Sequence, residues 1–333
     1  MTKQRVIMDV DTGSDDAVAI MAAILSPDID LVGLTTVAGN KEINFTTDNT
    51  LRVVELLGAD VPVYRGCEKA MVCTLLHNRH GDYTGATGVG TKLDAQGRKI
   101  EYHTDCLPLP APTIREQPEH AVFYLVDTLM RSDGDIVLVP TGPLTNLAMA
   151  MRLQPKICQK IKAICFMGGG FKVFNATSAS EFNIWADPEA AQIVVTSGVP
   201  VTMVPLDATH RANFTLDDAR ELRSWNTPAA DLVATLVEER VAAYNAFQPQ
   251  ELPDSAPLHD ALALAAVIDP QVLRDVRLMR VDVDISGGFA DGQTICDTRA
   301  FPDRTPNVRV ALDADRERFV TLIKSLLRSC PAR

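Results

Sequence analysis

Short apolar runs alternate with helical patterns through the first two thirds of the chain, and this alternation is what most constrains the fold. Apolar runs of strand length occupy residues 5–10, 29–37, 61–64, 136–140, 161–167 and 199–206. Segments of helical periodicity lie between them, at 17–25, 46–57, 121–131, 144–153 and 188–196. Apolar strands joined by helices are typical of a parallel sheet that is covered on both faces. The sequence therefore predicts an open, largely parallel, Rossmann-like α/β sheet with helices on both faces.

Beyond residue 206 the pattern becomes mostly helical, with predicted helices at 229–247, 259–268 and 316–328. Two alternating segments, 277–285 and 307–312, predict strands. We therefore expect additional C-terminal helices and a short antiparallel extension of the sheet. No internal repeat or Gly/Ser-rich linker divides the chain, so we expect residues 1–333 to form a single domain.

Acidic residues gather at the end of the first predicted strand, where Asp9, Asp11, Asp15 and Asp16 fall within eight positions. Ligands of open parallel sheets bind beyond the carboxyl ends of the strands. Gly13 permits a tight turn there, and Ser14 or Asp15 can cap the helix that follows. The helix dipole accounts for two acids, but four clustered carboxylates repel one another unless a cation is present. The pattern predicts a divalent metal site, and carboxylate donors without adjacent His or Cys favour Ca²⁺ or Mg²⁺.

Oxygen donors from distant segments would complete such a site. Thr141 follows a predicted strand and offers a backbone carbonyl, while Asp260 begins a predicted helix, where an acid alone would be a cap. Asn175, Glu181 and Asn183 lie in an irregular stretch after the glycines 168–170. No Lys-Ser or Lys-Thr pair follows these glycines, so the stretch is no phosphate-binding loop. Its side chains suit the hydroxyl groups of a sugar, each of which donates and accepts hydrogen bonds.

Charge and composition restrict the partners. The formal net charge of −11 disfavours nucleic acid and anionic membranes, whose phosphates require clustered Lys and Arg. The seven cysteines form no C-x-x-C pair, and no apolar run is long enough to span a bilayer or to serve as a signal segment. We therefore expect a reduced, cytoplasmic protein that acts on small molecules.

At this point the motifs carry a family resemblance. The run 9–17, DVDTGSDDA, resembles the DxDxGxDDA signature of the nucleoside hydrolases. Further stretches are similar to that family's motifs in the same order: 36–40 (TVAGN), 140–146 (PTGPLTN), 167–170 (MGGG), 175–177 (NAT), 181–184 (EFNI) and 259–260 (HD). The His that precedes the last Asp most resembles the inosine–uridine-preferring branch.

The resemblance implies calcium-dependent hydrolysis of the N-glycosidic bond of purine or pyrimidine ribonucleosides, giving free base and ribose in nucleoside salvage. The implied ligands of one Ca²⁺ are Asp11, Asp16, the Thr141 carbonyl and Asp260. The implied substrate contacts are Asp15, Asn40, His80, Met167, Asn175, Glu181, Phe182, Asn183 and Tyr244. Asp11 would be the general base that activates a calcium-bound water, and His259 would protonate or orient the leaving base. The family also implies a homodimer or homotetramer.

Two other functions fit part of the pattern. A haloacid-dehalogenase-like, Mg²⁺-dependent phosphatase would use Asp9 as nucleophile and Asp11 as acid and base, but it leaves Asp15, Asp16 and the segment 181–183 unexplained. A non-catalytic nucleoside-binding protein would share the fold. The presence of every implied metal and catalytic residue argues against it.

Overall fold

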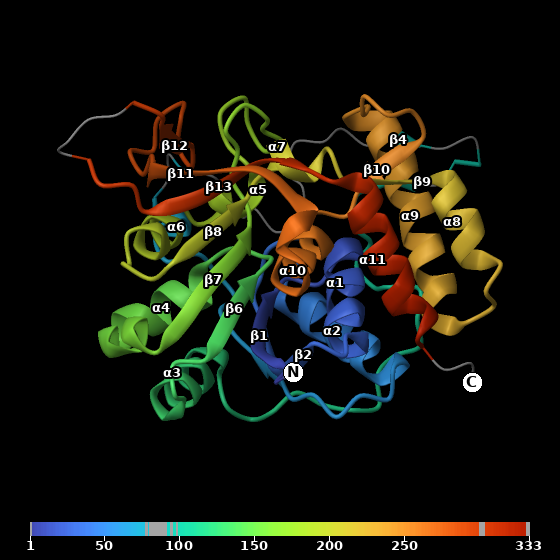
Figure 1. Ribbon diagram of the computed structural model, residues 1–333, viewed down its shortest axis with the longest axis horizontal. Helices are drawn as coiled ribbons and strands as arrows, with labels where there is room; N and C mark the ends of the chain where they lie inside the picture. The colour runs from blue at the N-terminus through green and yellow to red at the C-terminus, as the bar shows by residue number, and fades with distance from the viewer. Residues whose placement is uncertain are drawn as a thin grey trace.

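The computed structural model describes residues 2–76, 79, 92–93, 96–97, 99–299 and 304–330, and a nine-stranded sheet forms its centre (Figure 1). The strands of this sheet are β1 (Gln4–Val10), β2 (Ile29–Thr36), β3 (Val63–Arg65), β6 (Ile136–Pro140), β7 (Ile161–Met167), β8 (Val201–Val204), β11 (Leu273–Val283), β12 (Thr294–Asp297) and β13 (Val308–Ala314). Smaller two-stranded sheets pair β4 (Lys92–Leu93) with β5 (Lys99–Ile100) and β9 (Asn213–Thr215) with β10 (Ser255–Pro257).

The strand order in the large sheet is β12-β11-β13-β8-β7-β6-β1-β2-β3. All pairings from β3 through to β13 are parallel. The strands β11 and β12 then add an antiparallel edge to β13. The expected parallel sheet with an antiparallel extension is confirmed.

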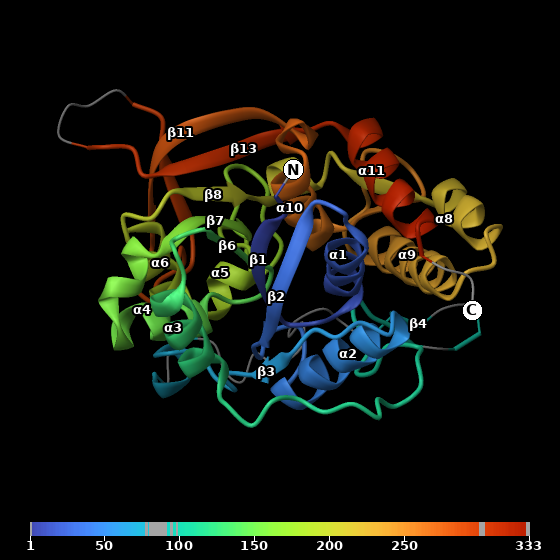
Figure 2. The ribbon, with the colours of Figure 1, turned by 60° about the horizontal axis from the view of Figure 1, so that its bottom comes forward.

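Helices cover both faces of the sheet (Figure 2). They are α1 (Ser14–Leu25), α2 (Ile43–Leu56), α3 (Ala121–Arg131), α4 (Thr145–Leu153), α5 (Phe182–Ala186), α6 (Pro188–Val195), α7 (Leu206–Thr209), α8 (Leu216–Arg223), α9 (Pro228–Phe247), α10 (His259–Ile268) and α11 (Arg316–Arg328), with short 3-10 turns at Cys73–Leu75, Pro155–Gln159 and Pro270–Val272. Across the described residues, no helix combines the length and the apolar character needed to cross a bilayer.

The central strands divide their side chains between two apolar cores because successive residues of a strand point to opposite faces. Val6, Met8 and Val10 of β1 pack in the core with α1, α9, α10 and α11, whereas Ile7 packs in the core with α3, α4 and α6. Burial on both faces explains why these strands are apolar throughout. It also holds the carboxyl ends of the strands in fixed positions beneath the functional site.

The start of α1 differs from the prediction. The helix begins at Ser14 rather than at residue 17, and Gly13 is its N-cap rather than Ser14 or Asp15. The backbone N–H of Gly13 donates to Asp16 Oδ2 over 2.9 Å, which ties the first turn together. The first turn is buried although its residues are polar, so apolar periodicity does not reveal it.

The sheet topology creates a crevice beside β1. This strand pairs with β2 on one side and with β6 on the other, so the connections that follow β1 and β6 diverge at their carboxyl ends. Such a reversal of strand order is where ligands bind in open α/β sheets. Asp11 and Thr141 follow β1 and β6 at this point.

Candidate active site

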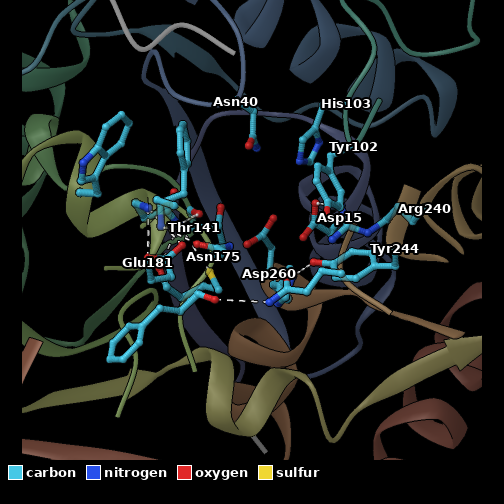
Figure 3. Close-up of a pocket in the computed structure, with 18 of the residues that line it drawn as sticks. Asp15, Asn40, Tyr102, His103, Thr141, Asn175, Glu181, Arg240, Tyr244 and Asp260 are labelled. Atoms are coloured by element: carbon cyan, nitrogen blue, oxygen red, sulfur yellow. Dashed lines mark hydrogen bonds and ion pairs between the residues drawn. The ribbon is translucent and has the colours of Figure 1, made fainter. Parts of the chain in front are cut away.

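A cavity of about 560 Å³ opens at the carboxyl ends of the central strands. Its lining combines Thr141 and Met167 from the sheet edge and Asp15 from the start of α1 with residues from α9 and the start of α10. Asp11 and Asp16 lie fully buried behind this lining. Figure 3 shows Asp15 and Asp260 between a wall that carries Glu181 and Asn175 and an opposite wall that carries Arg240 and Tyr244.

Carboxylates from two distant segments meet at the base of the cavity. Asp15, Asp16 and Asp260 each offer an oxygen within 4.8 Å of the others. Asp16 Oδ1 accepts a hydrogen bond from Thr141 Oγ1 over 2.8 Å, which links the end of β6 to α1. Asp11 Oδ2 accepts from the backbone N–H of Asn40 over 2.6 Å, but Asp11 Oδ1 is buried without a hydrogen-bond partner.

The carboxylate cluster carries an electrostatic cost that the charge of Arg240 offsets only in part. Burial, and then the neighbouring carboxylates Asp16 and Asp15, raise the pKa of Asp11 well above its ordinary value. Burial and the same kind of repulsion raise the pKa of Asp260, and they raise the pKa of Asp16 to about 6. Ionised carboxylates at such close range require a neutralising cation.

The donors fit a hard divalent cation. The orphaned Asp11 oxygen, the close carboxylates of Asp16 and Asp260 and the nearby Thr141 supply only oxygen atoms, the ligands that Ca²⁺ and Mg²⁺ prefer. These residues can therefore hold a metal ion.

One wall of the cavity presents a fixed set of polar groups. Glu181 is the N-cap of α5 and accepts from the backbone N–H groups of Gly169 (2.9 Å) and Asn183 (3.0 Å). Gly169 has φ of +77°, a conformation that favours glycine. Asn183 Nδ2 donates to the Thr141 carbonyl over 2.7 Å, and Asn175 Oδ1 accepts from the Phe182 N–H over 2.9 Å. These bonds hold amide and carboxylate groups in place around the cavity.

The opposite wall combines aromatic rings with one arginine. Tyr102 packs edge-on against Tyr244, with 5.1 Å between ring centroids. His103 Nδ1 accepts from the backbone N–H of Ser14 over 3.2 Å, and burial lowers its pKa to about 4. Arg240 is 1% exposed, and its Nη1 donates to Asp15 Oδ1 over 2.9 Å.

His259 is held by hydrogen bonds at both ring nitrogens. Its Nε2 lies 2.6 Å from the Tyr244 hydroxyl, and its Nδ1 lies 2.7 Å from Thr209 Oγ1. Burial, and then the charge of Arg240, lower its pKa well below the usual value, so the ring is neutral at neutral pH. The two hydrogen bonds fix the orientation of the ring and join it to the Tyr244 hydroxyl.

The structure brings most of the residues expected at the site to one cavity. Lining it are Asp15, Asn40, Thr141, Met167, Asn175, Glu181, Phe182, Asn183, Tyr244, His259 and Asp260. His80 lies outside the described residues. Asp9 is turned away from the cavity, because its Oδ1 accepts from Thr35 Oγ1 (2.6 Å) and Asn146 Nδ2 (2.8 Å).

Sequence patterns did not point to Arg240, Tyr102 or His103. Arg240 stands four residues before Tyr244, on the same buried face of α9. A charged residue on the buried face of a helix is unusual, and this was the sequence signal that could have indicated a functional role. Tyr102 and His103 come from an irregular segment that Asn49 anchors, since its Oδ1 accepts from the Leu107 N–H over 2.9 Å. Nothing local in the sequence marks them.

Comparison with known proteins agrees with this geometry. Residues 6–321 match the family model of the inosine-uridine preferring nucleoside hydrolases. The chain belongs to this family. The pyrimidine-specific ribonucleoside hydrolase RihB of Escherichia coli (strain K12) is 38% identical over 331 residues, which cover 98% of each chain.

Solved structures of nucleoside hydrolases share the fold over nearly the whole length. The purine-preferring ribonucleoside hydrolase from Gardnerella vaginalis gives a TM-score of 0.84 at 30% identity, covering 97% of this chain and 99% of that one. The plant nucleoside hydrolase PpNRh1 gives 0.82 at 29% identity, covering 98% and 99%. The expected family is confirmed and the phosphatase alternative is wrong, in keeping with an Asp9 that does not line the cavity.

Proposed function

We propose that the protein hydrolyses the N-glycosidic bond of ribonucleosides, releasing the free base and ribose for nucleoside salvage, and that it depends on one Ca²⁺. The observation that carries the proposal is the buried, unpartnered Asp11 oxygen beside three further carboxylates under a polar cavity. This arrangement suits a reaction in which positive charge develops on a sugar.

Asp11, Asp16, the Thr141 carbonyl and Asp260 would hold the ion. Ca²⁺ accepts six to eight oxygen ligands, so this set leaves positions for oxygens of the sugar and of water. A bound Ca²⁺ would orient those oxygens and lower the pKa of the attacking water.

The polar wall would bind the ribose. Asp15, Asn40, Asn175, Glu181 and Asn183 offer both donors and acceptors around the cavity, which sugar hydroxyls require. Met167 and Phe182 add apolar surface beside these groups and would restrict access of bulk water. The bonds that already fix Glu181 and Asn183 mean that little ordering is needed when the sugar binds.

Asp11 would act as the general base. Its free Oδ1 can take a proton from the attacking water as the oxygen bonds to the anomeric carbon. The C–N bond to the base breaks through an oxocarbenium-like state, and the surrounding carboxylates stabilise its positive charge.

The base would lie against the aromatic wall that Tyr102 and Tyr244 form together. The Tyr244 hydroxyl is the group through which His259 can influence the departing base, because the two are joined by a 2.6 Å hydrogen bond. Thr209 holds the other ring nitrogen and fixes the ring orientation.

The test is incubation of the pure protein with inosine, uridine and p-nitrophenyl phosphate, in Ca²⁺ and after chelation. We expect ribose from the nucleosides, no phosphate release, and loss of activity on chelation that Ca²⁺ restores. Nucleoside binding without ribose release would contradict the proposal in favour of a non-catalytic binding protein. Size-exclusion chromatography of the same sample tests the expected homodimer or homotetramer.

A further inference from the structure

Arg240 is the single Lys or Arg among the described residues that line the cavity, and its position is fixed from three directions. Its Nε donates to the Pro257 carbonyl over 3.0 Å. Its Nη1 donates to Ser14 Oγ over 2.8 Å and to Asp15 Oδ1 over 2.9 Å. An arginine held in this way cannot swing out of the site and stays charged at every pH at which the protein is folded.

The remaining terminal nitrogen, Nη2, makes no hydrogen bond to any described residue. The side chain is almost fully buried and lines the cavity, so this donor is available to a molecule bound there. Figure 3 shows Arg240 beside Tyr244 and Tyr102, on the wall opposite Glu181. The guanidinium carbon lies 5.5 Å from the centre of the Tyr244 ring.

The need to neutralise Asp15 does not explain why an arginine is held here with Nη2 left free. Pairing with Asp15 uses one nitrogen, and a lysine would supply that charge as well. Only the planar fork of arginine provides a second donor at a fixed angle to the first. The second donor is left for a molecule in the cavity, on the wall with Tyr102 and Tyr244 where the proposed function places the base.

A fixed positive charge beside the base distinguishes nucleosides by the charge that the base carries as the C–N bond breaks. When the C–N bond breaks, its electron pair goes to the ring nitrogen. In uracil and hypoxanthine that negative charge spreads to carbonyl oxygens, which a guanidinium can stabilise. Cytosine and adenine carry amino groups and leave most readily after protonation, so the base is cationic before the bond breaks and departs as a neutral molecule. A neighbouring arginine repels such a cation.

We propose that Arg240 determines base specificity, favouring ribonucleosides whose base leaves as an oxygen-stabilised anion over those whose base must be protonated. The proposal rests on the proposed nucleoside hydrolase function. In the balanced step, water adds its oxygen to the anomeric carbon and gives one proton to Asp11. The base departs with the bonding electron pair and later takes up a proton from solvent.

The test compares kcat/KM for uridine against cytidine and for inosine against adenosine, in wild type, Arg240→Gln and Arg240→Lys. Within each pair the ribose is identical, so any disturbance of Asp15 cancels from the ratio. We expect wild type to favour uridine and inosine, and Arg240→Gln to reduce both ratios by about 10- to 100-fold, the size of one hydrogen bond to a charged group. Arg240→Lys keeps the charge and should retain more of each ratio than the glutamine variant.

The outcomes separate the two proposals. Absence of ribose release from every nucleoside by wild type would overturn the proposed function and this inference with it. Ribose release with ratios that Arg240→Gln leaves within twofold would overturn the inference alone, even if overall activity falls.

A wild-type measurement keeps the inference testable should the variants fail to fold. Product inhibition by 5-fluorouracil should strengthen as pH rises and this base ionises, whereas inhibition by cytosine should not. Equal pH responses of the two bases would contradict a cationic base site.

Discussion

Asp11 shows how a single side chain can be both fixed and reactive. One carboxylate oxygen is held by the N–H of Asn40, and the other is buried with no partner. Leaving a buried polar atom unpaired is costly, so such atoms in folded proteins point to a missing ligand or to a chemical role. Under the proposed function, Asp11 has both.

We predict that Asp11→Ala lowers kcat/KM for nucleosides by at least about 1,000-fold, because the general base and a metal ligand are lost together. Bound calcium per chain should fall in parallel, as measured by atomic absorption. Asp30→Ala is the matched control, since Asp30 is an exposed acid distant from the cavity. Near-normal turnover of Asp11→Ala would remove Asp11 from the mechanism.

Tyr244→Phe keeps the ring but removes the hydroxyl that joins it to His259. We expect kcat for natural nucleosides to fall by about 10- to 100-fold, whereas p-nitrophenyl riboside, whose leaving group needs no assistance, should be cleaved almost normally. His259→Ala should show the same selectivity, and the double variant should be no worse than either single one. Equal losses on both kinds of substrate would assign the pair to packing alone.

The pKa of Glu181 predicts a pH effect on stability. Burial raises it from 4.5 to about 7 in the folded protein, although backbone N–H groups partly oppose the shift. The folded state therefore binds more protons than the unfolded state between about pH 4.5 and 7, so this group's contribution to stability falls as pH rises through that window. The measured quantity is the difference in free energy of unfolding between wild type and Glu181→Gln, both free of metal. We expect this difference to decrease by up to about 3 kcal/mol as the pH rises from about 4.5 to 7. Urea titrations at several pH values measure this, and a constant difference would contradict the shifted pKa.

At the scale of elements, the turns that follow β2 and β6 close tightly around Asp11. A Cβ atom on Gly39 would lie 2.1 Å from Asp11 Oδ2 and 2.7 Å from Pro143 Cδ, and one on Gly142 would lie 2.9 Å from Asp11 Cγ. The strand ends thus shape the site through the absence of side chains as much as through their presence.

Gly39→Ala should therefore weaken calcium binding and lower kcat/KM by about 10-fold or more, although every carboxylate is retained. The added Cβ displaces Asp11, and a shift of about 1 Å in a catalytic group lowers the rate by at least this factor. Gly288→Ala is the control, since its added Cβ would meet nothing closer than Ser286 Oγ at 3.5 Å. The calcium affinity of both variants is measured from the rise of the thermal unfolding midpoint as calcium is added. Unchanged calcium affinity in Gly39→Ala would show that Asp11 is free to move.

Elements that are either amphipathic helices or continuous apolar runs were predicted to the residue. The helices α3, α10 and α11 and the strands β6 and β7 have the predicted bounds. The predictions for α1 and β11 start too late, at residue 17 rather than Ser14 and at residue 277 rather than Leu273. The first turn of α1 is buried but polar, and the first residues of β11 are mostly exposed, so neither shows the expected hydrophobic pattern.

At the scale of the whole molecule, a buried ion-pair cluster connects three distant parts of the chain. Arg79 donates from Nε and Nη2 to both carboxylate oxygens of Asp291, over 2.9 and 2.7 Å, and from Nη1 to Glu189 of α6. Asp291 lies in the connection between β11 and β12. The arginine therefore ties residue 79 to the antiparallel edge of the sheet.

We predict that Arg79→Ala lowers the free energy of unfolding by about 3 kcal/mol, because the buried Asp291 and the half-buried Glu189 lose their counter-charge. The control is Arg131→Ala, which removes an exposed pair with Asp127 and should change stability by less than about 1 kcal/mol. Denaturant unfolding of both variants provides the comparison. A small effect at Arg79 would mean that water or a shift of the chain compensates the carboxylates.

The sequence by itself determined the class of fold and the chemical character of the site. Alternating apolar runs define the layered sheet, and Asp11, Asp15 and Asp16 are close because they are neighbours along the chain, at a strand end where ligands bind. Ordered motifs then indicated the family, which the comparisons confirm. Local patterns suffice for these features because burial period and strand-end position are local properties.

Only the tertiary structure decided what surrounds the carboxylates. Arg240 reaches Asp15 from 225 positions away, and His103 reaches Ser14 across 89 positions. The Tyr244–His259–Thr209 chain of hydrogen bonds joins three helices or their ends. Such pairings depend on how helices pack over the sheet edge, and nothing in the local periodicity of α9 fixes which side chain will face the cavity. The carboxylate cluster could therefore be predicted from the sequence, whereas the wall that carries Arg240 and Tyr102 is set by packing.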